Sequence, residues 1–168
     1  MSPSANAPET APGTAPATVH GTAVALGGRA VLIRGPSGSG KSDLALRCLA
    51  LPPVLEGWPR AALVADDQVA LTRTETGMIE MRVPPAIAGQ IEVRGVGIVN
   101  VPHVASAELA LVADLVAPGE VARYPIEPET AEIMGRAYPL VRIAPFEASA
   151  PVKLILALGT LPEVSASP

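Results

Sequence analysis

The sequence has few aromatic residues and a deficit of basic charge. One Trp, two Tyr and one Phe make up 2% of its 168 residues. Proteins that bind single-stranded nucleic acid stack bases on aromatic side chains and neutralise phosphates with basic surfaces. Here 12 Lys and Arg are outnumbered by 16 Asp and Glu. The composition therefore argues against a nucleic-acid-binding protein, and we expect no nucleic acid as partner.

Cysteine and long apolar runs are also scarce. The single cysteine, Cys48, excludes an internal disulfide and a cysteine-based zinc site. No segment reaches the roughly 18 apolar residues that a transmembrane helix needs. The first basic residue is Arg29, so we expect no positively charged leader ahead of an apolar stretch of the kind that a secretory signal has. We therefore expect a soluble, cytoplasmic protein without a membrane partner.

Apolar residues nevertheless make up 49% of the chain, which is enough for the core of one domain. With so few aromatics, we expect that core to consist of Ala, Val, Leu and Ile. Residues 1–18, rich in Ala, Pro, Thr and Ser, are predicted to form a disordered tail. Residues 160–168 have a similar composition and are predicted to form a flexible tail, which leaves residues 19–159 as the folded domain.

Short apolar runs bounded by Gly and Pro predict a mixed α/β domain with many strands and two helices. Two hairpins are predicted, at 20–26 with 29–34 around Gly27-Gly28, and at 68–73 with 78–83. Further strands are predicted at 61–65, 91–95, 97–101, 108–116 and 138–143, and helices at 42–51 and 149–159. The uniformly apolar run at 61–65 is typical of a buried central strand.

Residues 35–42 read GPSGSGKS and match the phosphate-loop pattern G-x-x-x-x-G-K-[ST]. The pattern lies between a predicted strand and a predicted helix, where backbone N–H groups and the helix N-terminus can face phosphates. A Gly/Ser linker is the alternative, and those neighbouring elements argue against it. Lys41 can reach the β- and γ-phosphates, and Ser42 can bind Mg²⁺. The predicted nucleotide-binding residues are Gly35, Pro36, Ser37, Gly38, Ser39, Gly40, Lys41 and Ser42.

Acidic residues elsewhere could complete such a site. Asp66 and Asp67 follow the run at 61–65, and in phosphate-loop folds an acid at that place can reach Mg²⁺ or its water. Because neighbouring strand residues point in opposite directions, one acid would face metal and the other an acceptor hydroxyl. The alternative is a pair that only caps a strand. Glu92 and Arg94 would share one strand face, as a catalytic unit or as a surface ion pair.

Four segments together resemble the catalytic domain of HPr kinase/phosphorylase, the serine kinase of the phosphocarrier protein HPr. They read VHGTAVAL, GPSGSGKS, VADDQVAL and IEVRGVGIVNV. That family carries a histidine 15 residues before the phosphate loop, which is the spacing from His20 to Gly35. Its signature E-[IV]-R-G-[LV]-G-I is matched by residues 92–98, and most phosphate-loop proteins lack it. The resemblance covers residues 20–159.

The resemblance implies a phosphate-loop kinase fold akin to that of phosphoenolpyruvate carboxykinase, with a mixed sheet and few flanking helices. It implies ATP and Mg²⁺ as cofactors, HPr of the phosphotransferase system as substrate, and a homo-oligomer, since family members form hexamers. The residues it implicates are His20, Lys41, Asp66, Asp67, Arg94 and Arg123 in catalysis, and Ser42 with Glu92 in metal binding. Either aspartate could be the general base on the HPr serine.

The sequence also departs from the family pattern. Longer members have an N-terminal domain of more than a hundred residues, whereas a short Pro/Ala tail precedes His20 here, as in short proteobacterial forms. Residues 142–147 replace a basic Pro-Gly-Arg-Asn-type loop linked to dephosphorylation, which argues against reverse phosphorylase activity. Residues 51–60 form an insertion relative to the family's usual link.

Two other functions remain open from the sequence. One is a kinase of another protein or of a small molecule on the same fold, against which the signature at 92–98 argues. The other is a non-catalytic ATP-sensing module, against which the retained Asp66, Asp67 and Glu92 argue. A GTPase is disfavoured because the chain has no N-K-x-D motif.

Overall fold

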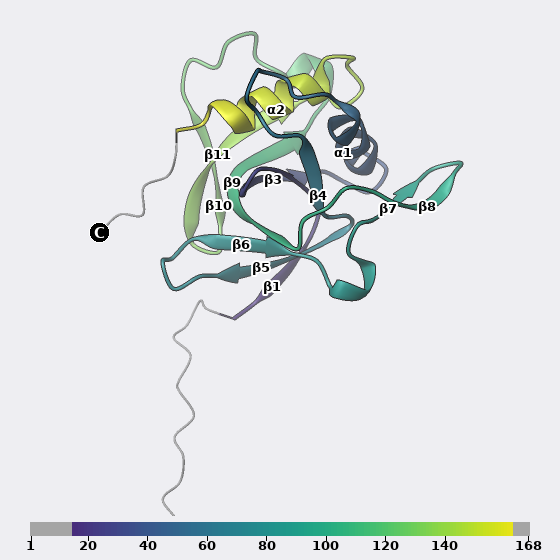
Figure 1. The fold of residues 1–168 in the computed structure, drawn as a ribbon. Helices are drawn as coiled ribbons and strands as arrows, with labels where there is room; N and C mark the ends of the chain where they lie inside the picture. Colours follow the sequence, from purple (N-terminus) through teal and green to yellow (C-terminus); the bar gives the residue numbers. More distant parts are fainter. Residues whose placement is uncertain (1–14, 163–168) are drawn as a thin grey trace, which may run out of the picture.

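The computed structural model describes residues 15–162, which form a curled nine-stranded sheet, a separate two-stranded hairpin and two helices (Figure 1). The strands are β1 (Ala17–His20), β2 (Thr22–Leu26), β3 (Arg29–Arg34), β4 (Ala61–Ala65), β5 (Gln68–Arg73), β6 (Ile79–Arg82), β7 (Gln90–Val93), β8 (Gly97–Asn100), β9 (Ser106–Leu115), β10 (Glu129–Ile133) and β11 (Arg136–Ile143). The helices are α1 (Lys41–Ala50) and α2 (Ala150–Thr160), with short 3-10 turns η1 (Pro85–Ile87) and η2 (Pro118–Glu120).

The sheet mixes parallel and antiparallel pairs, as the sequence predicts. Its main order is β1-β5-β6-β9-β3-β2-β4, and β11 pairs with the second half of β9 and with β10. The β3–β9 and β9–β11 pairs are parallel, and the others are antiparallel. Arg34, Asp114 and Arg142 are aligned in register, so the carboxyl ends of β3, β9 and β11 meet at one edge.

Both predicted hairpins are present. In the first, Leu26 pairs with Arg29, and Gly27 adopts a φ of 65° in the two-residue turn. Positive φ in such a turn matches the twist of the strands, and glycine adopts it without a steric penalty. In the second hairpin, β5 and β6 pair from Ala70–Arg82 to Arg73–Ile79.

The run at 20–26, predicted as one strand, is divided at Gly21. β1 pairs with β5, whereas β2 pairs with β3 and β4. A Cβ at Gly21 would lie 2.9 Å from the backbone oxygen of Ile33, so only glycine fits where the chain changes partner. His20 therefore ends a different strand from the one that precedes the phosphate loop.

The predicted tails are only partly described. β1 begins at Ala17, inside the segment predicted as a disordered tail, and α2 includes Thr160. The remainder of the two predicted tails, residues 1–14 and 163–168, lies outside the described residues.

The prediction of a central position for residues 61–65 is wrong, because β4 is the last strand of the sheet order. Its side chains are buried in both core layers, Leu63 on the helix side and Val64 inside the curl, and another segment covers its outer edge at Leu63. The N–H of Leu63 donates to the oxygen of Pro102 at 2.9 Å, and the N–H of Val104 donates to the oxygen of Leu63 at 2.9 Å. The apolar run thus reports burial of the side chains on both faces of β4, which is compatible with a place at the edge of the sheet.

The strand β10 was not predicted from the sequence. It pairs with β11 through a two-residue turn in which Met134 and Gly135 have φ values of 50° and 77°. Glycine is a common signal for such a turn, but methionine in the left-handed region is rare. In β10 the buried Ala131 and Ile133 stand among exposed Glu and Thr residues, so the sequence lacks an apolar run there.

The core forms two layers on opposite faces of the sheet. Val31 and Ile33 of β3 face the helices, where they pack with buried leucines of α1 and α2. Leu32 faces the other way and packs with Leu71 and Met81 inside the curl of the sheet. Both helices cover the same face of the sheet (Figure 1). The continuous apolar run of β3 follows from its burial on both faces. Most of the core is aliphatic, as predicted, but Met78, Met81, Tyr138 and Cys48 are also buried in it.

No helix within residues 15–162 is long and apolar enough to cross a membrane.

Cys48 provides a test of the layer between the helices. Its side chain is fully buried on α1, and burial raises its pKa from the ordinary 9.0 to about 12, with a smaller opposing effect of Arg47. We expect a thiol reagent at pH 8 to react with Cys48 in urea but scarcely with the folded protein, because both access and the thiolate are suppressed.

The same pKa shift has a pH signature. Above pH 9 the unfolded thiol loses its proton while the folded thiol keeps it, so the free energy of unfolding falls between pH 9 and 12. Urea unfolding at pH 8 and pH 10 measures this fall, with Cys48→Ala as the control that lacks it. Rapid labelling of the folded protein would contradict the described packing.

Candidate functional site

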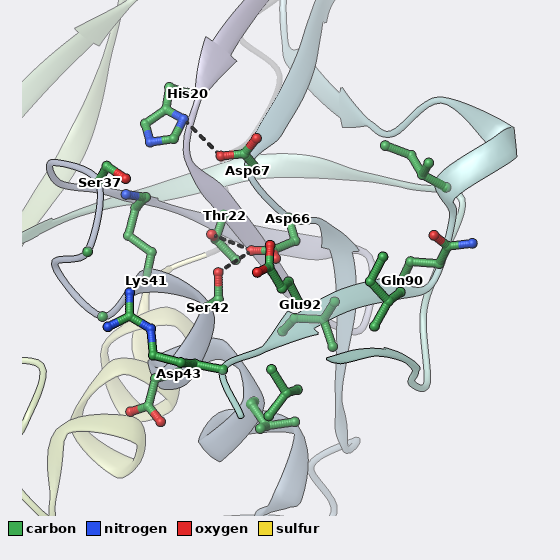
Figure 2. Close-up of a pocket in the computed structure, with 18 of the residues that line it drawn as sticks. His20, Thr22, Ser37, Lys41, Ser42, Asp43, Asp66, Asp67, Gln90 and Glu92 are labelled. Carbon is green, nitrogen blue, oxygen red and sulfur yellow. Dashed lines mark hydrogen bonds and ion pairs between the residues drawn. The ribbon is translucent and has the colours of Figure 1, made fainter. Parts of the chain in front are cut away.

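The phosphate-loop sequence connects β3 to α1, and a cavity of about 700 Å³ opens beside it. The walls of this cavity, which we name the loop cavity, come from the phosphate loop, the start of α1, the β4–β5 turn and the β7–β8 hairpin (Figure 2). His20 at the end of β1 and Thr22 at the start of β2 also line it. Together with Phe146, the lining residues come from five separate segments of the chain, within residues 20–22, 37–46, 66–67, 87–98 and at 146.

Lys41 is folded against its own loop. Its side chain is 6% exposed, and Nζ donates to the backbone oxygens of Gly35 at 2.8 Å and Pro36 at 2.9 Å. An ammonium group has three N–H donors, so one remains for an anion. The first N–H groups of α1 have no side-chain cap, and Gly40 before them has a φ of 96°. The loop thus presents a cation and backbone donors to the same place.

Asp66 connects the phosphate loop to the sheet. Ser42 Oγ donates to its Oδ1 at 2.7 Å, and the fully buried Thr22 donates to the same oxygen at 2.9 Å. Glu92 of β7 also lines the loop cavity, and in the view of Figure 2 it overlaps Asp66. A hydroxyl and two carboxylates are oxygen ligands of the kind that Mg²⁺ prefers.

The set fits Mg²⁺ better than a metal that needs a full protein cage. Within residues 15–162 no group of three or more His, Cys, Asp or Glu side chains is close enough to hold a metal ion. Mg²⁺ typically binds through one or two carboxylates, with water and substrate phosphates completing its shell. Ser42, Asp66 and Glu92 meet that requirement only when a phosphate ligand is present.

Asp67 faces a different partner from Asp66. Its Oδ1 lies 3.2 Å from His20 Nδ1, and the two side chains are 72% and 50% exposed. Asp67 has a φ of 70°, and the N–H of Gln68 donates to the oxygen of Asp66 across it. This tight left-handed turn, rather than strand alternation, separates the two carboxylates. Such strained conformations of residues other than glycine occur preferentially at functional sites.

The two predicted catalytic arginines lie in different surroundings. Arg94 lines the loop cavity, but it begins the turn after β7, so the prediction that it shares a strand face with Glu92 is wrong. Arg123 lies in an exposed segment between η2 and β10 and does not line the loop cavity. Arg123 is therefore a predicted catalytic residue that the structure places away from the loop cavity.

Thr22, Gln90 and Phe146 are among the lining residues that the sequence analysis did not identify. Thr22 is separated from Asp66 by 44 positions, and nothing in the pattern TAVAL marks its hydroxyl as a site group. Phe146 carries a possible signal, because it is the only Phe in the sequence and follows a proline near the end of a strand.

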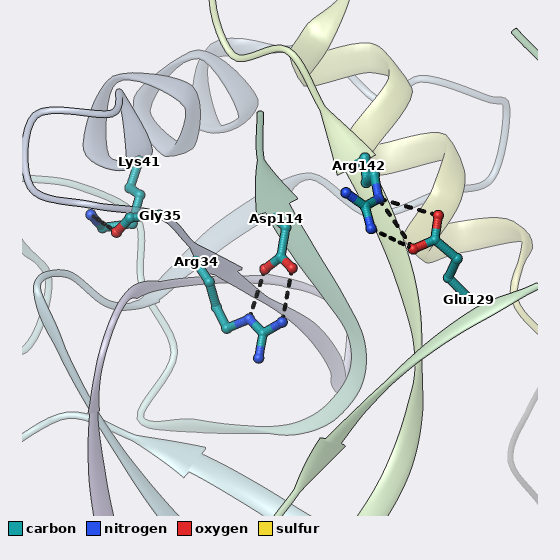
Figure 3. A network of polar contacts seen from close by, with 6 residues as sticks. All are labelled: Arg34, Gly35, Lys41, Asp114, Glu129 and Arg142. Atoms are coloured by element: carbon teal, nitrogen blue, oxygen red, sulfur yellow. Dashed lines mark hydrogen bonds and ion pairs between the residues drawn. The ribbon is translucent and has the colours of Figure 1, made fainter. Parts of the chain in front are cut away.

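An ion pair holds the base of the phosphate loop. Arg34, the last residue of β3, donates through Nε and Nη2 to both oxygens of Asp114 at 2.7 and 2.9 Å (Figure 3). Arg142 of β11 turns to Glu129 instead. Two parallel hydrogen bonds fix the orientation of both side chains, and they help to keep β3 and β9 in register at the point where the chain leaves the sheet.

The sequence matches the family of the HPr Serine kinase C-terminal domain over residues 14–143. The HPr kinase/phosphorylase of Burkholderia lata is 33% identical over 127 residues, which are 70% of this chain and 37% of that protein. The HPr kinase/phosphorylase of Bordetella petrii is 42% identical over 84 residues, 50% of this chain and 25% of that protein. The chain thus spans little more than a third of the first of these relatives.

A solved structure, that of the HPr(Ser) kinase/phosphatase from Coxiella burnetii, is similar in fold. The TM-score is 0.66 and the identity 25%, with 84% of this chain and 88% of the other covered. This similarity confirms the predicted phosphate-loop kinase fold. Since the family match includes the phosphate loop, both aspartates and the signature at 92–98, the chain belongs to the family of the HPr Serine kinase C-terminal domain.

Proposed function

We propose that this chain is an ATP- and Mg²⁺-dependent kinase that phosphorylates a serine of an HPr-like phosphocarrier protein. One observation carries the proposal: a phosphate loop, an acid bonded to its serine, and a second acid paired with a histidine all line one cavity. A cytoplasmic location and a homo-oligomeric assembly belong to the same proposal.

In the proposed reaction the loop and Lys41 would hold the phosphates of ATP, and Ser42, Asp66 and Glu92 would hold the metal. Charge neutralisation at the β- and γ-phosphates is the chemistry that Mg²⁺ supplies when bound. Phosphoryl transfer depends mainly on positioning and charge, so the residues need not form a covalent intermediate.

We assign the general base to Asp67 rather than Asp66. Asp66 already accepts two hydrogen bonds from Ser42 and Thr22, which direct its charge toward the phosphate loop. Asp67 is exposed at the mouth of the cavity, where a serine of another protein can approach. As the serine oxygen bonds to the γ-phosphorus and the bond to the leaving ADP breaks, Asp67 accepts the hydroxyl proton. His20 orients the carboxylate.

A different protein or small-molecule acceptor is the second candidate, because the open side of the loop cavity does not by itself specify HPr. The reverse reaction with inorganic phosphate is proposed to be weak. Residues 142–147 lack the basic loop linked to it by the family resemblance, and Glu147 adds an acid there.

The first test incubates the protein with HPr from the same organism and radiolabelled Mg·ATP. We expect acid-stable label on HPr, as phosphoserine gives, and loss of transfer by at least about a hundredfold in Lys41→Ala because the γ-phosphate loses its cation. The matched control is Lys153→Ala, on α2, which removes the only other lysine of the sequence. We expect this variant to transfer phosphate as the wild type does.

Retained transfer in Lys41→Ala would contradict the phosphate-loop assignment. Absence of label on HPr, with ATP still bound, would favour another acceptor or an ATP-sensing module. Added inorganic phosphate, after the label is on HPr, measures the reverse reaction.

The second test separates the two aspartates. Asp67→Asn is expected to lower kcat by about a hundredfold or more, the range of a lost general base, with little change in ATP affinity. Asp66→Asn is expected to raise the Mg²⁺ concentration needed for half-maximal activity, because it removes charge next to Ser42. Kinetics over a Mg²⁺ titration measure both effects. The reverse pattern would assign the base to Asp66.

A further inference from the structure

A second cavity of about 550 Å³ lies on the other side of the phosphate loop. It is formed by residues that follow β9 and β11, together with Pro36 and Ser39 of the loop, and we name it the strand-end cavity. Its volume is within the range of small-molecule sites, about 300–1,000 Å³. None of the residues assigned above to the metal or to proton transfer lines it.

The position of this cavity follows from the parallel strands. β3, β9 and β11 run in the same direction, and ligands of α/β sheets bind beyond the carboxyl ends of such strands. Asp66 lies at the end of β4, which is on one side of β3 with β2 between them. The strand-end cavity lies on the other side of β3, beyond the ends of β9 and β11. The phosphate loop forms the wall between the two cavities.

A nucleotide bound to the loop would therefore reach both sides. Ser37, Gly38 and Gly40 line the loop cavity, while Pro36 and Ser39 line the strand-end cavity. With the γ-phosphate directed toward Asp67, the nucleoside end of the molecule must leave the loop in another direction. The strand-end cavity, which Pro36 and Ser39 of the loop line, is the space that could receive the nucleoside in that direction.

Phe146 offers a stacking surface at this place. It borders both cavities, and its ring is so close to the loop that a Cβ on Gly40 would lie 3.0 Å from it. Phe146, the only Phe of the chain, is nevertheless 74% exposed. An exposed aromatic ring held against a phosphate loop suits the face of a nucleobase. Leu115, Val116 and Pro145 supply apolar walls.

Two polar groups in the strand-end cavity have unused hydrogen-bonding capacity. Ser39 Oγ is buried and has no hydrogen-bond partner within residues 15–162, whereas buried polar groups are normally paired. Glu120 accepts the N–H of Ala117 at one carboxylate oxygen, at 2.9 Å, which leaves the other oxygen for a ligand donor. Apolar walls with a few polar groups are the usual composition of a site for a small organic ligand.

We infer that the strand-end cavity is the base subsite of the nucleotide: it holds the adenine of ATP, stacked on Phe146, with the exocyclic amino group donating to Glu120. The inference rests on the proposed nucleotide-dependent activity and adds the residues that recognise the base.

The test compares ATP with inorganic tripolyphosphate, which has the phosphates but no base. Dissociation constants of both, with Mg²⁺, are measured by calorimetry for the wild type, Phe146→Ala and Phe146→Trp. Phe146→Ala is expected to weaken ATP binding about tenfold and to leave tripolyphosphate binding unchanged. Phe146→Trp retains ATP binding, since its ring still stacks. Tyr124→Ala, at an exposed aromatic outside both cavities, is the control.

Equal weakening of both ligands in Phe146→Ala would show that Phe146 only shapes the loop through Gly40, and would overturn the inference. Unchanged ATP binding in that variant would also overturn it. If wild-type protein binds tripolyphosphate as tightly as ATP, the base contributes nothing and the subsite is rejected, while the phosphate loop stands. Failure to bind either ligand would reject the proposed function itself.

A second measurement examines Glu120. Wild-type protein is expected to bind ATP several-fold more tightly than purine riboside triphosphate, which lacks the amino group, because one charge-assisted hydrogen bond is lost. Glu120→Ala should bind the two nucleotides equally. A variant that only disturbs η2 would weaken both nucleotides and keep their ratio, and that outcome would remove Glu120 from the subsite.

Discussion

The pairing of β3 between β2 and β9 is the constraint on which the rest of the site depends. β3 is antiparallel to β2 and parallel to β9, and the two sides of its apolar run are buried in the two core layers. The phosphate loop starts where this pairing ends, at the Arg34–Asp114 ion pair. A loop of small residues can hold Lys41 and the first turn of α1 in place because the strand before it is paired at both edges and buried on both faces.

The two acids illustrate how backbone geometry divides functions between neighbouring residues. Both follow β4, but the left-handed conformation of Asp67 turns its side chain to His20, while Asp66 remains with Ser42 and Thr22. A carboxylate bound by two hydroxyls is directed toward the phosphates, and an exposed carboxylate beside a histidine is available to an incoming substrate. One turn thus separates a metal-side acid from a solvent-side acid.

Glu92 reaches the site on an element that could not fold alone. The β7–β8 hairpin is outside the main sheet, and isolated two-stranded hairpins are at best marginally stable. Ile91 is 1% exposed and packs in the helix-side core, which anchors the hairpin next to α1. The neighbouring Glu92 is exposed, and it lines the loop cavity, as do Ile91 and Val93 on either side of it. The exposed Val96 and Ile98 lie beyond this anchor.

The sequence by itself determined the local features: the phosphate loop, its flanking strand and helix, both hairpin turns and the aliphatic core, because glycine positions and apolar periodicity act within a few residues. Tertiary structure alone decided the rest. It separated β1 from β2 at Gly21, placed β4 at an edge, brought Thr22 to Asp66 and put Phe146 against Gly40. These contacts join residues far apart in the chain, where the sequence carries no periodic signal, and depend on which strands pair.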